Sequence, residues 1–459
     1  MDNRLIREEL NYNIIELQTL HATLFNTLNP EQLAIYHQVM NAVLTKQGGL
    51  FFLYGPGGTR KTFLYNTVLA KLRSEKMIVL AVASSGIASL LLPGGRTSHS
   101  RFVIPLELME NSTCGIKHNT HLAALLKEAR LIIWDEEPMT QKFDFEALDK
   151  TLRDILGAKD ETNRAKLFGG MPILLGGDFR QILPVIPKGK RQEIVHACIN
   201  RSDLWQHCHL HTLSRIMRVN EYTTDGQLDT RKHEFNKWVL DIGEGKVPTT
   251  SKEGDDEPTW IKIPDEFIVK SENPPIDTIV DVIFPNYIER QEDEEYLRER
   301  AILTPRNDDA YEINKHMFKK LQGTRLCNGT RLIITAFQFF LLQARIITGS
   351  HVGKSVIIPR IVLTSTESKW PFIMQRIQFS VRPCYAMTIN KSQGQSLKFV
   401  GLYLPKPVFS HGQLYVALSR VTDPAGLKIV MLNDREERLR DHTKNVVYKE
   451  TFFNLTNTL

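Results

Sequence analysis

The chain has 459 residues, of which 42% are apolar and 24% are charged, a balance typical of a soluble globular protein rather than a disordered or fibrous one. Its 58 Lys and Arg against 52 Asp and Glu leave a net charge of +6, which is compatible with a polyanionic partner without requiring one. Five scattered cysteines argue against a disulfide framework, and the start MDNRLIREEL lacks the apolar core of a signal peptide. The longest uncharged apolar-rich run, Leu332 to Ala344, is shorter than the ~20 residues that span a bilayer. We therefore expect a soluble intracellular protein of about two to four domains.

Residues 3–26 are predicted to form a helix. Leu10, Ile14, Leu17 and Leu24 recur on one face at helical spacing. Three heptads are short for a coiled coil, so we favour a helix that packs on the following domain over one that binds a partner.

Short apolar strands then alternate with helices. The predicted strands are Leu50–Tyr54, Met77–Ala83, Leu131–Trp134 and Ile173–Leu175, and the predicted helix after the first of them is Thr62–Ser74. This alternation is typical of a parallel sheet covered on both faces, in which ligands bind beyond the carboxyl ends of the strands.

The second half begins after an acidic, Pro-rich stretch. Residues 250–298 predict exposed connections. From Ala301 a second parallel-sheet pattern starts, and it continues at Phe399–Leu404 and Leu427–Leu432. The β-branched and aromatic segment Thr324–Val381 predicts a small inserted β unit such as a barrel.

The most informative motif is GPGGTRKT at Gly55–Thr62. It fits the phosphate-loop pattern G-x-x-x-x-G-K-[ST] between a strand and a helix, except that Arg60 replaces the second glycine. In such a loop backbone N–H groups cradle nucleotide phosphates, Lys61 would contact them, and Thr62 would bind Mg²⁺.

Further polar motifs follow predicted strands or helices. Asp135 would hold Mg²⁺ through water, and Glu136 would orient and deprotonate the attacking water. Gln181 of GDFRQ would sense the γ-phosphate and the attacking water. The segment GQLYVALSR predicts a helix ending in Arg420, which would act as an arginine finger. Each motif alone is weak, since surface turns and ordinary surface arginines look the same.

The whole series is more specific. It comprises LNPEQ at 28–32, the phosphate loop, SSGIA at 84–88, TSHSRF at 97–102, WDE at 134–136, GDFRQILPV at 177–185, Met-Arg at 217–218, NGTRL at 328–332, TINKSQGQSL at 388–397 and SHGQLYVALSR at 410–420. In this order the motifs resemble those of superfamily-one DNA helicases of the PIF/RecD type, over nearly the whole chain. More narrowly, the chain resembles the helicase domain of Helitron rolling-circle transposons.

The resemblance implies an α/β fold with two RecA-like parallel-sheet domains, a small wedge insertion and an inserted SH3-like β barrel. The implied parts are an N-terminal helix at 1–27, a first domain at 28–215 with the wedge at about 97–125, and a second domain at 216–459 with the barrel at about 324–381.

The resemblance also implies a function. It is that of an ATP-dependent 5′–3′ DNA helicase, in which hydrolysis of ATP with Mg²⁺ drives translocation on single-stranded DNA and unwinding of a forked duplex. The resemblance further implies that the protein is a monomer that acts in the nucleus, in DNA repair or recombination. It implies no attachment to a membrane.

The resemblance carries site residues over to this chain. The implied catalytic residues are Lys61, Glu136, Gln181, Arg218 and Arg420. The implied nucleotide contacts are Gln32, Gly55, Gly57, Gly58, Thr59, Lys61, Thr62 and Gly394, with Thr62 and Asp135 at Mg²⁺. The implied DNA contacts are Ser84, Ser85, Arg101, Phe102 and Lys391, although Phe102 is also compatible with core packing.

Three residues depart from the family pattern. The family has Gly where this chain has Arg60, usually Ala where it has Glu137, and Asn where it has Ile216. The alternative to a helicase is therefore an ATPase-impaired, transposon-derived remnant that still binds single-stranded nucleic acid. A phosphate-loop enzyme for small molecules is disfavoured because it would not need the motifs after residue 394.

Two metal-site interpretations are also disfavoured. His209-Leu210-His211 resembles the metal pair of a rolling-circle nuclease, but no acidic partner or tyrosine helix accompanies it. The nearby Cys198 and Cys208 lack the paired spacing of a zinc site.

Overall fold

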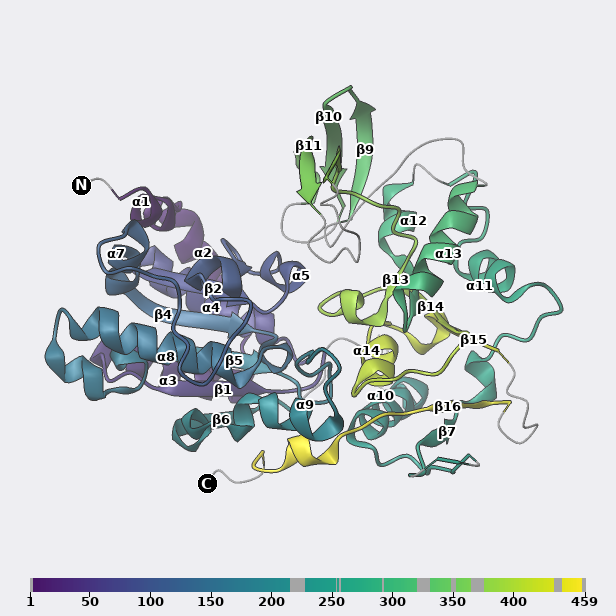
Figure 1. The fold of residues 1–459 in the computed structure, drawn as a ribbon, viewed down its shortest axis with the longest axis horizontal. Coiled ribbons are helices and arrows are strands. Elements are labelled where there is room, and N and C mark those ends of the chain that lie inside the picture. The colour runs from purple at the N-terminus through teal and green to yellow at the C-terminus, as the bar shows by residue number, and fades with distance from the viewer. Residues whose placement is uncertain are drawn as a thin grey trace. The chain divides into compact units, whose positions relative to one another are not determined.

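The structure is a computed structural model that describes residues 3–214, 228–252, 254–255, 257–290, 293–319, 331–347, 352–364, 375–432 and 440–455 (Figure 1). The chain divides into two compact units. The first comprises Met1–Lys246, Ser410–Tyr415 and Val446–Leu459, and the second comprises Val247–Phe409 and Val416–Asn445. The domain boundary predicted at residues 215 and 216 lies outside the described residues, and the implied domain limits stay predictions.

A six-stranded parallel sheet forms the centre of the first unit, in the order β3-β2-β4-β5-β1-β6. Its strands are β1 (Leu50–Tyr54), β2 (Ile78–Ala83), β3 (Arg96–Thr97), β4 (Ala129–Asp135), β5 (Ile173–Gly177) and β6 (Cys208–Thr212). The four predicted strands are confirmed. The stretch His209–His211, weighed above as a metal pair, lies in the edge strand β6 beside β1.

The helices of the first unit cover both faces of this sheet. They are α1 (Arg4–Leu10), α2 (Ile14–Phe25), α3 (Pro30–Thr45), α4 (Lys61–Ser74), α5 (Gly86–Ser89), α6 (Ser98–Phe102), α7 (His121–Glu128), α8 (Lys142–Gly157), α9 (Arg191–Ala197) and α10 (Thr230–Glu244). Along β1, Leu50 and Phe52 pack with α7 and α8, whereas Phe51 and Leu53 pack with α3 and α4. Two covered faces explain why the strands are apolar throughout rather than alternating.

The N-terminal segment is two helices, not the single helix predicted over residues 3–26. Helix α2 begins after Asn13, whose side chain accepts a hydrogen bond from the Glu16 N–H. Asn competes with the helical backbone in this way, and so it favours a new N-terminus over continuation. Ile14, Leu17 and Leu24 lie half-buried on one face as predicted, but Leu10 is exposed.

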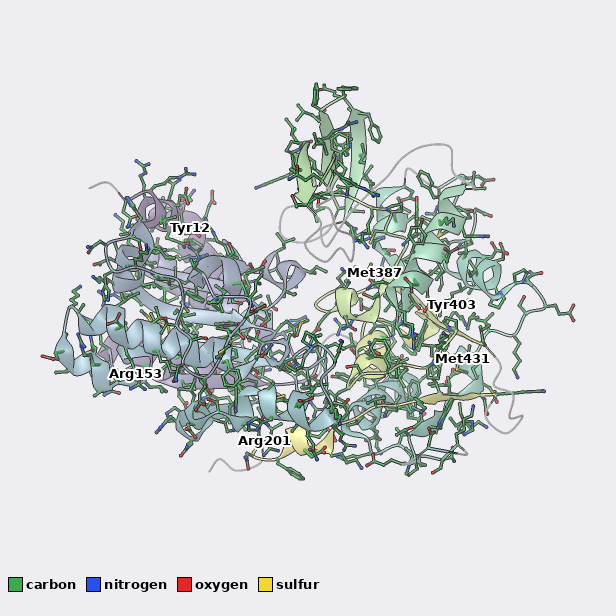
Figure 2. All side chains as sticks on the ribbon, in the orientation of Figure 1. Tyr12, Arg153, Arg201, Met387, Tyr403 and Met431 are labelled. Atoms are coloured by element: carbon green, nitrogen blue, oxygen red, sulfur yellow. The ribbon has the colours of Figure 1, made fainter. Side chains whose placement is uncertain are left out.

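Helix α1 is held to the first unit by a buried ion cluster. The Glu9 carboxylate accepts a 2.6 Å hydrogen bond from Arg101 of α6 and lies 3.7 Å from the guanidinium of Arg73. The Arg73 guanidinium stacks 4.4 Å from the ring centre of Tyr12, which is labelled in Figure 2. Removing one partner of such a cluster would leave a buried charge uncompensated.

The second unit contains a second parallel sheet, in the order β13-β8-β14-β15. Its strands are β8 (Arg300–Thr304), β13 (Ala386–Thr388), β14 (Phe399–Leu404) and β15 (Leu427–Met431). The predicted α/β class with two parallel sheets is thereby confirmed. A two-stranded antiparallel sheet pairs β7 (Trp260–Lys262) with β16 (His442–Lys444).

The inserted β unit is an antiparallel sheet in the order β12-β11-β10-β9. Its strands are β9 (Leu332–Phe337), β10 (Leu341–Ile346), β11 (Ser355–Thr364) and β12 (Gln375–Phe379). This sheet is consistent with the β insertion expected at about 324–381.

The helices α11 (Pro275–Ile283), α12 (Glu294–Arg298) and α13 (Asn307–Lys319) belong to the second unit, and α14 (Gln413–Leu418) begins in the first and ends in the second. The prediction of exposed connections over 250–298 is wrong in part. Ile279, Val280 and Ile283 of α11 are fully buried, because their helical spacing outweighs the acidic composition around them.

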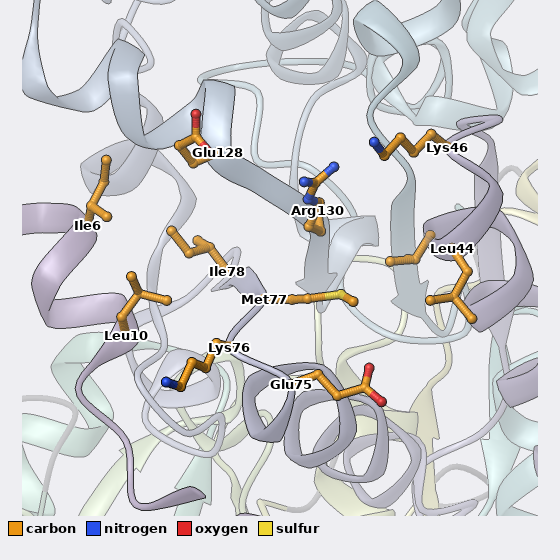
Figure 3. Close-up of a pocket in the computed structure, with 11 residues that line it drawn as sticks. Ile6, Leu10, Leu44, Lys46, Glu75, Lys76, Met77, Ile78, Glu128 and Arg130 are labelled. Atoms are coloured by element: carbon orange, nitrogen blue, oxygen red, sulfur yellow. The ribbon is translucent and has the colours of Figure 1, made fainter.

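A cavity of about 410 Å³ opens at the end of the first sheet away from the phosphate loop (Figure 3). Ile6 and Leu10 of α1 line it, with Ile78 at the start of β2 and Arg130 near the start of β4. Since ligands bind parallel sheets at the carboxyl ends of their strands, this cavity is not the candidate site. Across the described residues, every helix is too short or too polar to cross a membrane.

Replacing Phe102 with Ala should lower the free energy of unfolding by about 3–5 kcal/mol, because the ring is fully buried beside Trp134 and its loss leaves a cavity. Urea unfolding measures the change, and Phe453→Ala, at a ring that is 59% exposed, is the control with little expected effect. Little change in stability together with a loss of single-strand affinity would instead identify Phe102 as a DNA-stacking residue.

Candidate nucleotide-binding site

The loop Gly55–Arg60 connects β1 to α4 at the carboxyl edge of the first sheet. The Gly55 N–H donates to the Gly177 carbonyl at the end of β5 (3.3 Å), and Thr59 donates through its N–H and its hydroxyl to the Pro56 carbonyl. Gly58 has a φ of +100°, which suits a residue without Cβ. The loop is thus a compact turn at the N-terminus of a 14-residue helix, where the helix dipole favours an anion.

Two predicted site residues pack against this loop from either side. Lys61, the first residue of α4, folds back and donates from Nζ to the carbonyl oxygens of Gly55 (2.6 Å) and Pro56 (3.4 Å). Gln32 is buried, donates to the Thr59 carbonyl (3.3 Å), and accepts the N–H of its own helix cap, Asn29. In this structure Gln32 therefore ties α3 to the loop, and its predicted contact with adenine stays a prediction.

Arg60 adopts a left-handed conformation, which a glycine adopts without steric cost. Its φ is 60° and its ψ is 41°, and its side chain is exposed, with the guanidinium 5.9 Å from the ring centre of Phe63. The loop therefore keeps its turn, and the side chain extends into solvent rather than into the loop. A left-handed non-Gly residue costs about 1–2 kcal/mol, so the substitution leaves strain at the phosphate loop.

Asp135 and Glu136 lie at the same edge of the sheet, at the end of β4. Both are buried, and the Glu136 N–H donates to Asp135 Oδ1 (2.9 Å). Burial and then the neighbouring Glu136 charge raise the pKa of Asp135 to about 7, and the Lys61 charge opposes this. A cation stabilises buried carboxylates of this kind, so the oxygen donors of Asp135 and Thr62 would suit Mg²⁺.

Glu137, which stands where the family usually has Ala, lies apart from this pair in its hydrogen bonding. Its side chain is fully buried, and neither carboxyl oxygen has a hydrogen-bond partner among the described residues. Burial raises its pKa well above the ordinary value, which favours the uncharged form. Burial likewise raises the pKa of the Cys198 and Cys208 thiols in the same interior.

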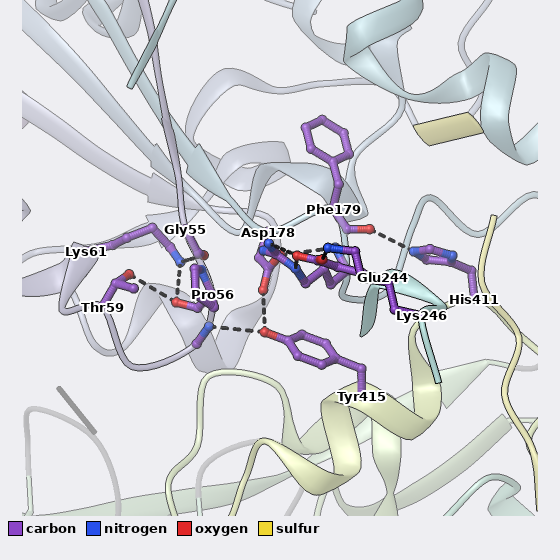
Figure 4. A network of polar contacts seen from close by, with 12 residues as sticks. Gly55, Pro56, Thr59, Lys61, Asp178, Phe179, Glu244, Lys246, His411 and Tyr415 are labelled. Carbon is purple, nitrogen blue, oxygen red and sulfur yellow. Dashed lines mark hydrogen bonds and ion pairs between the residues drawn. The ribbon is translucent and has the colours of Figure 1, made fainter. Parts of the chain in front are cut away.

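Residues 178–181 follow β5, the strand between β4 and β1. Asp178 is fully buried and accepts hydrogen bonds from the Arg180 N–H and guanidinium, both at 3.1 Å. Arg180 also pairs with Glu244 of α10 (Figure 4). Its guanidinium stacks over the ring of Tyr54. Gln181 is buried, and its Oε1 has no hydrogen-bond partner among the described residues, as befits a side chain that would take a ligand or water.

Sequence reasoning missed the residues that complete this network. Tyr415 donates from its hydroxyl to Asp178 Oδ2 (2.7 Å), and His411 bonds the Phe179 carbonyl through Nε2 (2.7 Å). Gly412 has a φ of +71°, and a Cβ there would lie 2.4 Å from the Arg180 carbonyl oxygen. The sequence signal for these residues was the segment SHGQLY at 410–415. In the motif that contains it, a role was predicted only for Arg420, which lies after this segment.

Three predicted site residues, Lys391, Gly394 and Arg420, belong to the second unit. Arg420 is buried, and its guanidinium donates to the carbonyl oxygens of Val416 (2.9 Å) and Gln395 (3.2 Å). Gly394 has a φ of +78°, and Lys391 donates to the Asn307 side chain (3.4 Å). Arg218 lies outside the described residues. The nucleotide and DNA roles of these four residues stay predictions.

The predicted DNA contacts of the first unit divide into two groups. Ser84 and Ser85 lie half-buried after β2, where Ser84 Oγ accepts from Trp134 Nε1 (3.0 Å) and Ser85 caps α5. Arg101 and Phe102 are buried, so in this structure neither presents a side chain to a DNA strand. For Phe102 the core-packing alternative fits, and Arg101 serves the Glu9 ion cluster.

Two parallel α/β sheets, with a glycine-rich phosphate loop at a strand–helix junction of the first, define a P-loop nucleotide-binding protein. Residues 27–253 match the model of the PIF1-like helicase family. The chain therefore contains a PIF1-like helicase domain, which spans just under half of its length.

Curated relatives are similar over most of their length. The ATP-dependent DNA helicase Pif1 of Campylobacter jejuni is 26% identical over 82% of this chain and 88% of its own. That of Bdellovibrio bacteriovorus is 28% identical over 89% of each chain.

Solved structures share the fold. A Bacteroides Pif1 helicase in complex with ADP-AlF3 and single-stranded DNA has a TM-score of 0.60 at 20% identity, covering 90% of this chain and 98% of its own. The Candida albicans Pif1 helicase has a TM-score of 0.58 at 20% identity, covering 93% and 98%.

Replacing Arg60 with Gly should raise the free energy of unfolding by about 0.5–1 kcal/mol, because relief of left-handed strain is partly offset by the added freedom of glycine in the unfolded chain. Urea unfolding measures the gain. Lys46→Gly is a matched control, since Lys46 is also exposed and left-handed (φ 55°) but caps the far end of α3. A loss of stability in the Arg60 variant alone would show that the arginine makes a stabilising contact.

Replacing Glu137 with Met should stabilise the protein by about 1–3 kcal/mol at pH 7, because it removes a buried carboxyl group without a described partner. Because burial raises the pKa of Glu137 in the folded protein above the value of ~4.3 in the unfolded chain, rising pH favours unfolding of the unmodified protein. The advantage of the variant should therefore grow as the pH rises above ~4.3.

Urea unfolding at several pH values, with the exposed Glu107→Met as control, checks this prediction. A stability difference that is independent of pH would show that Glu137 is ionised in the folded state.

Proposed function

We propose that this protein is an ATP-dependent DNA helicase that moves 5′ to 3′ along a single strand. The observation that carries the proposal is the sheet order β4-β5-β1, which brings Asp135 and Glu136, Gln181 and the phosphate loop to one edge of one sheet. Each group is one that ATP hydrolysis requires, and no small-molecule chemistry is needed to explain them.

Each residue has a distinct part in the proposed reaction. The loop N–H groups and Lys61 bind the nucleotide phosphates, and Thr62 and Asp135 hold Mg²⁺. Bound Mg²⁺ neutralises charge that develops on the phosphoryl oxygens. Glu136 orients and deprotonates the attacking water. The buried side-chain amide oxygen of Gln181, Oε1, accepts a hydrogen bond from the same water.

The proposed DNA substrate comes from the relatives. The Bacteroides enzyme was solved with single-stranded DNA, and another similar structure concerns unwinding at forked double-stranded DNA by two coordinating Pif1 helicases. In this chain Ser84, Ser85 and Lys391 are the remaining candidate strand contacts, and Arg218 and Arg420 are the candidate γ-phosphate contacts. A monomeric enzyme, a nuclear location, and a Helitron origin are further parts of the proposal that rest on the sequence motifs.

One observation favours a second function. Arg60 holds a left-handed conformation at the position where the family pattern has Gly, and strain there would misplace phosphate-binding N–H groups. The second candidate is therefore a protein that binds single-stranded nucleic acid without turning over ATP.

Single-strand-stimulated ATP hydrolysis, measured for the unmodified protein, Arg60→Gly and Lys61→Ala, separates the two functions. We expect turnover in the unmodified protein, a two- to tenfold gain in kcat/KM for Arg60→Gly from relief of about 0.5–1.4 kcal/mol of strain, and loss in Lys61→Ala. Unwinding should follow for a fork with a 5′ single-stranded arm and not for one with a 3′ arm.

Three other outcomes are informative. Turnover in Arg60→Gly alone would establish the ATPase-impaired function for the natural chain. Turnover that Lys61→Ala retains would exclude the phosphate loop as the site. Unwinding from the 3′ arm would overturn the proposed direction.

A further inference from the structure

The Tyr415 hydroxyl lies between the phosphate loop and residues 178–181 (Figure 4). It donates to Asp178 Oδ2 at 2.7 Å and accepts the Gly57 N–H at 3.4 Å. The bond to Asp178 is charge-assisted and short, whereas the bond from Gly57 is at the long limit for an N–H donor. One hydroxyl therefore joins two parts of the site with unequal strength.

The segment that carries Tyr415 is held firmly in the first unit. Gly412 packs against the Arg180 and Gln181 carbonyl oxygens so closely that a Cβ would lie 2.4–2.5 Å from them. The Tyr448 N–H donates to His411 Nδ1 (2.7 Å), so His411 carries its proton on Nε2 and donates it to the Phe179 carbonyl. Burial lowers the pKa of His411 to about 4, which keeps the ring in this neutral form.

The Tyr415 ring itself has little room to move. It is 1% exposed, and a Cβ at Gly243 would lie 2.7 Å from its Cδ2 atom. Burial, and then the Asp178 charge, raise the pKa of Tyr415 well above its ordinary value, so the hydroxyl keeps its proton and donates to Asp178. The hydroxyl oxygen therefore interacts with the Gly57 N–H through a lone pair, as an acceptor.

The backbone N–H groups of a phosphate loop are the donors that bind phosphate oxygens. We propose that the Tyr415 hydroxyl competes with a nucleotide phosphate oxygen for the Gly57 N–H, and that it thereby links occupancy of the phosphate loop to Asp178. The inference rests on the proposed binding of ATP at this loop. Tyr415 is a positioning residue, because it acts through Gly57 and Asp178 and not on the reacting atoms.

The competition has a defined direction. A phosphate oxygen is charged and accepts a stronger hydrogen bond than a phenol oxygen, so it displaces the hydroxyl from Gly57. The hydroxyl keeps its bond to Asp178, which two bonds from Arg180 also hold. Release of the weaker bond separates the Gly57 N–H from the Tyr415 hydroxyl while Tyr415 stays bound to Asp178, and this is the structural signal that phosphate has bound.

The test compares Tyr415→Phe with the unmodified protein. Tyr296→Phe is the matched control, since Tyr296 is also 1% exposed and donates to a backbone carbonyl, that of Pro285, in the second unit. Hydrogen exchange of the peptide that contains residues 55–60 is measured without nucleotide, ADP affinity is measured by titration, and kcat and KM for ATP are measured with single-stranded DNA.

In Tyr415→Phe we expect faster exchange of the loop peptide and about two- to fivefold tighter ADP binding, because no hydroxyl has to be displaced. We also expect a lower KM for ATP with about a tenfold lower kcat, since one positioned hydrogen bond to a charged group is lost. If Tyr415 had only a structural role, the variant would bind ADP more weakly, and the fall in kcat would not be accompanied by a lower KM.

The possible failures are distinguishable. Unchanged loop exchange and unchanged ADP affinity, in a protein that binds ADP, would overturn the role of Tyr415 and leave the proposed ATPase standing. Faster loop exchange in a protein that binds no ADP would overturn both the proposed ATPase and the competition, and would reduce Tyr415 to an anchor of the loop. Weaker ADP binding in the variant would also overturn the competition.

Discussion

The site depends on one constraint, the parallel pairing of β4, β5 and β1 as neighbours. Parallel strands end at the same edge, so three segments far apart in sequence place Asp135, Gln181 and Lys61 around one volume. The strands can be buried on both faces because α3 and α4 cover one side and α7 and α8 the other. The apolar core and the polar edge are therefore two results of the same arrangement.

Buried charge at this edge is compensated in different ways. Asp178 is satisfied within the protein by Arg180 and Tyr415, and Glu9 is satisfied by Arg101 at the other end of the unit. Asp135 lies beside Glu136, whose charge raises the Asp135 pKa after burial, and the Lys61 charge opposes this, which is an electrostatic environment that suits a metal site. Neither carboxyl oxygen of Glu137 has a hydrogen-bond partner among the described residues, and burial favours its protonated form. Burial alone is thus not a sign of function, and the partner of each carboxyl group decides its role.

The sequence predicted structure correctly where the local hydrophobic pattern or motif and the tertiary environment favour the same conformation. The continuously apolar strands and the phosphate loop were predicted because their period and motif need no partner to be recognised. The predicted helix over residues 3–26 failed at Asn13, where a side-chain cap outweighs the apolar period. Arg101 and Phe102 were given DNA roles from their motif, but burial and the ion pair with Glu9, 92 residues away, decide where they lie. No local pattern reports a contact of that separation.

The α/β class, the two parallel sheets, the family resemblance and the phosphate loop could be predicted from the sequence, because they depend on short-range periodicity and on motifs in a defined order. The roles of Arg60, Glu137 and Tyr415 became visible only in the folded chain. Arg60 adopts the left-handed turn with its side chain in solvent, Glu137 lies inside the core, and Tyr415 meets Gly57 across 358 positions of sequence. Each outcome depends on which atoms surround the side chain after folding, and that information is long-range.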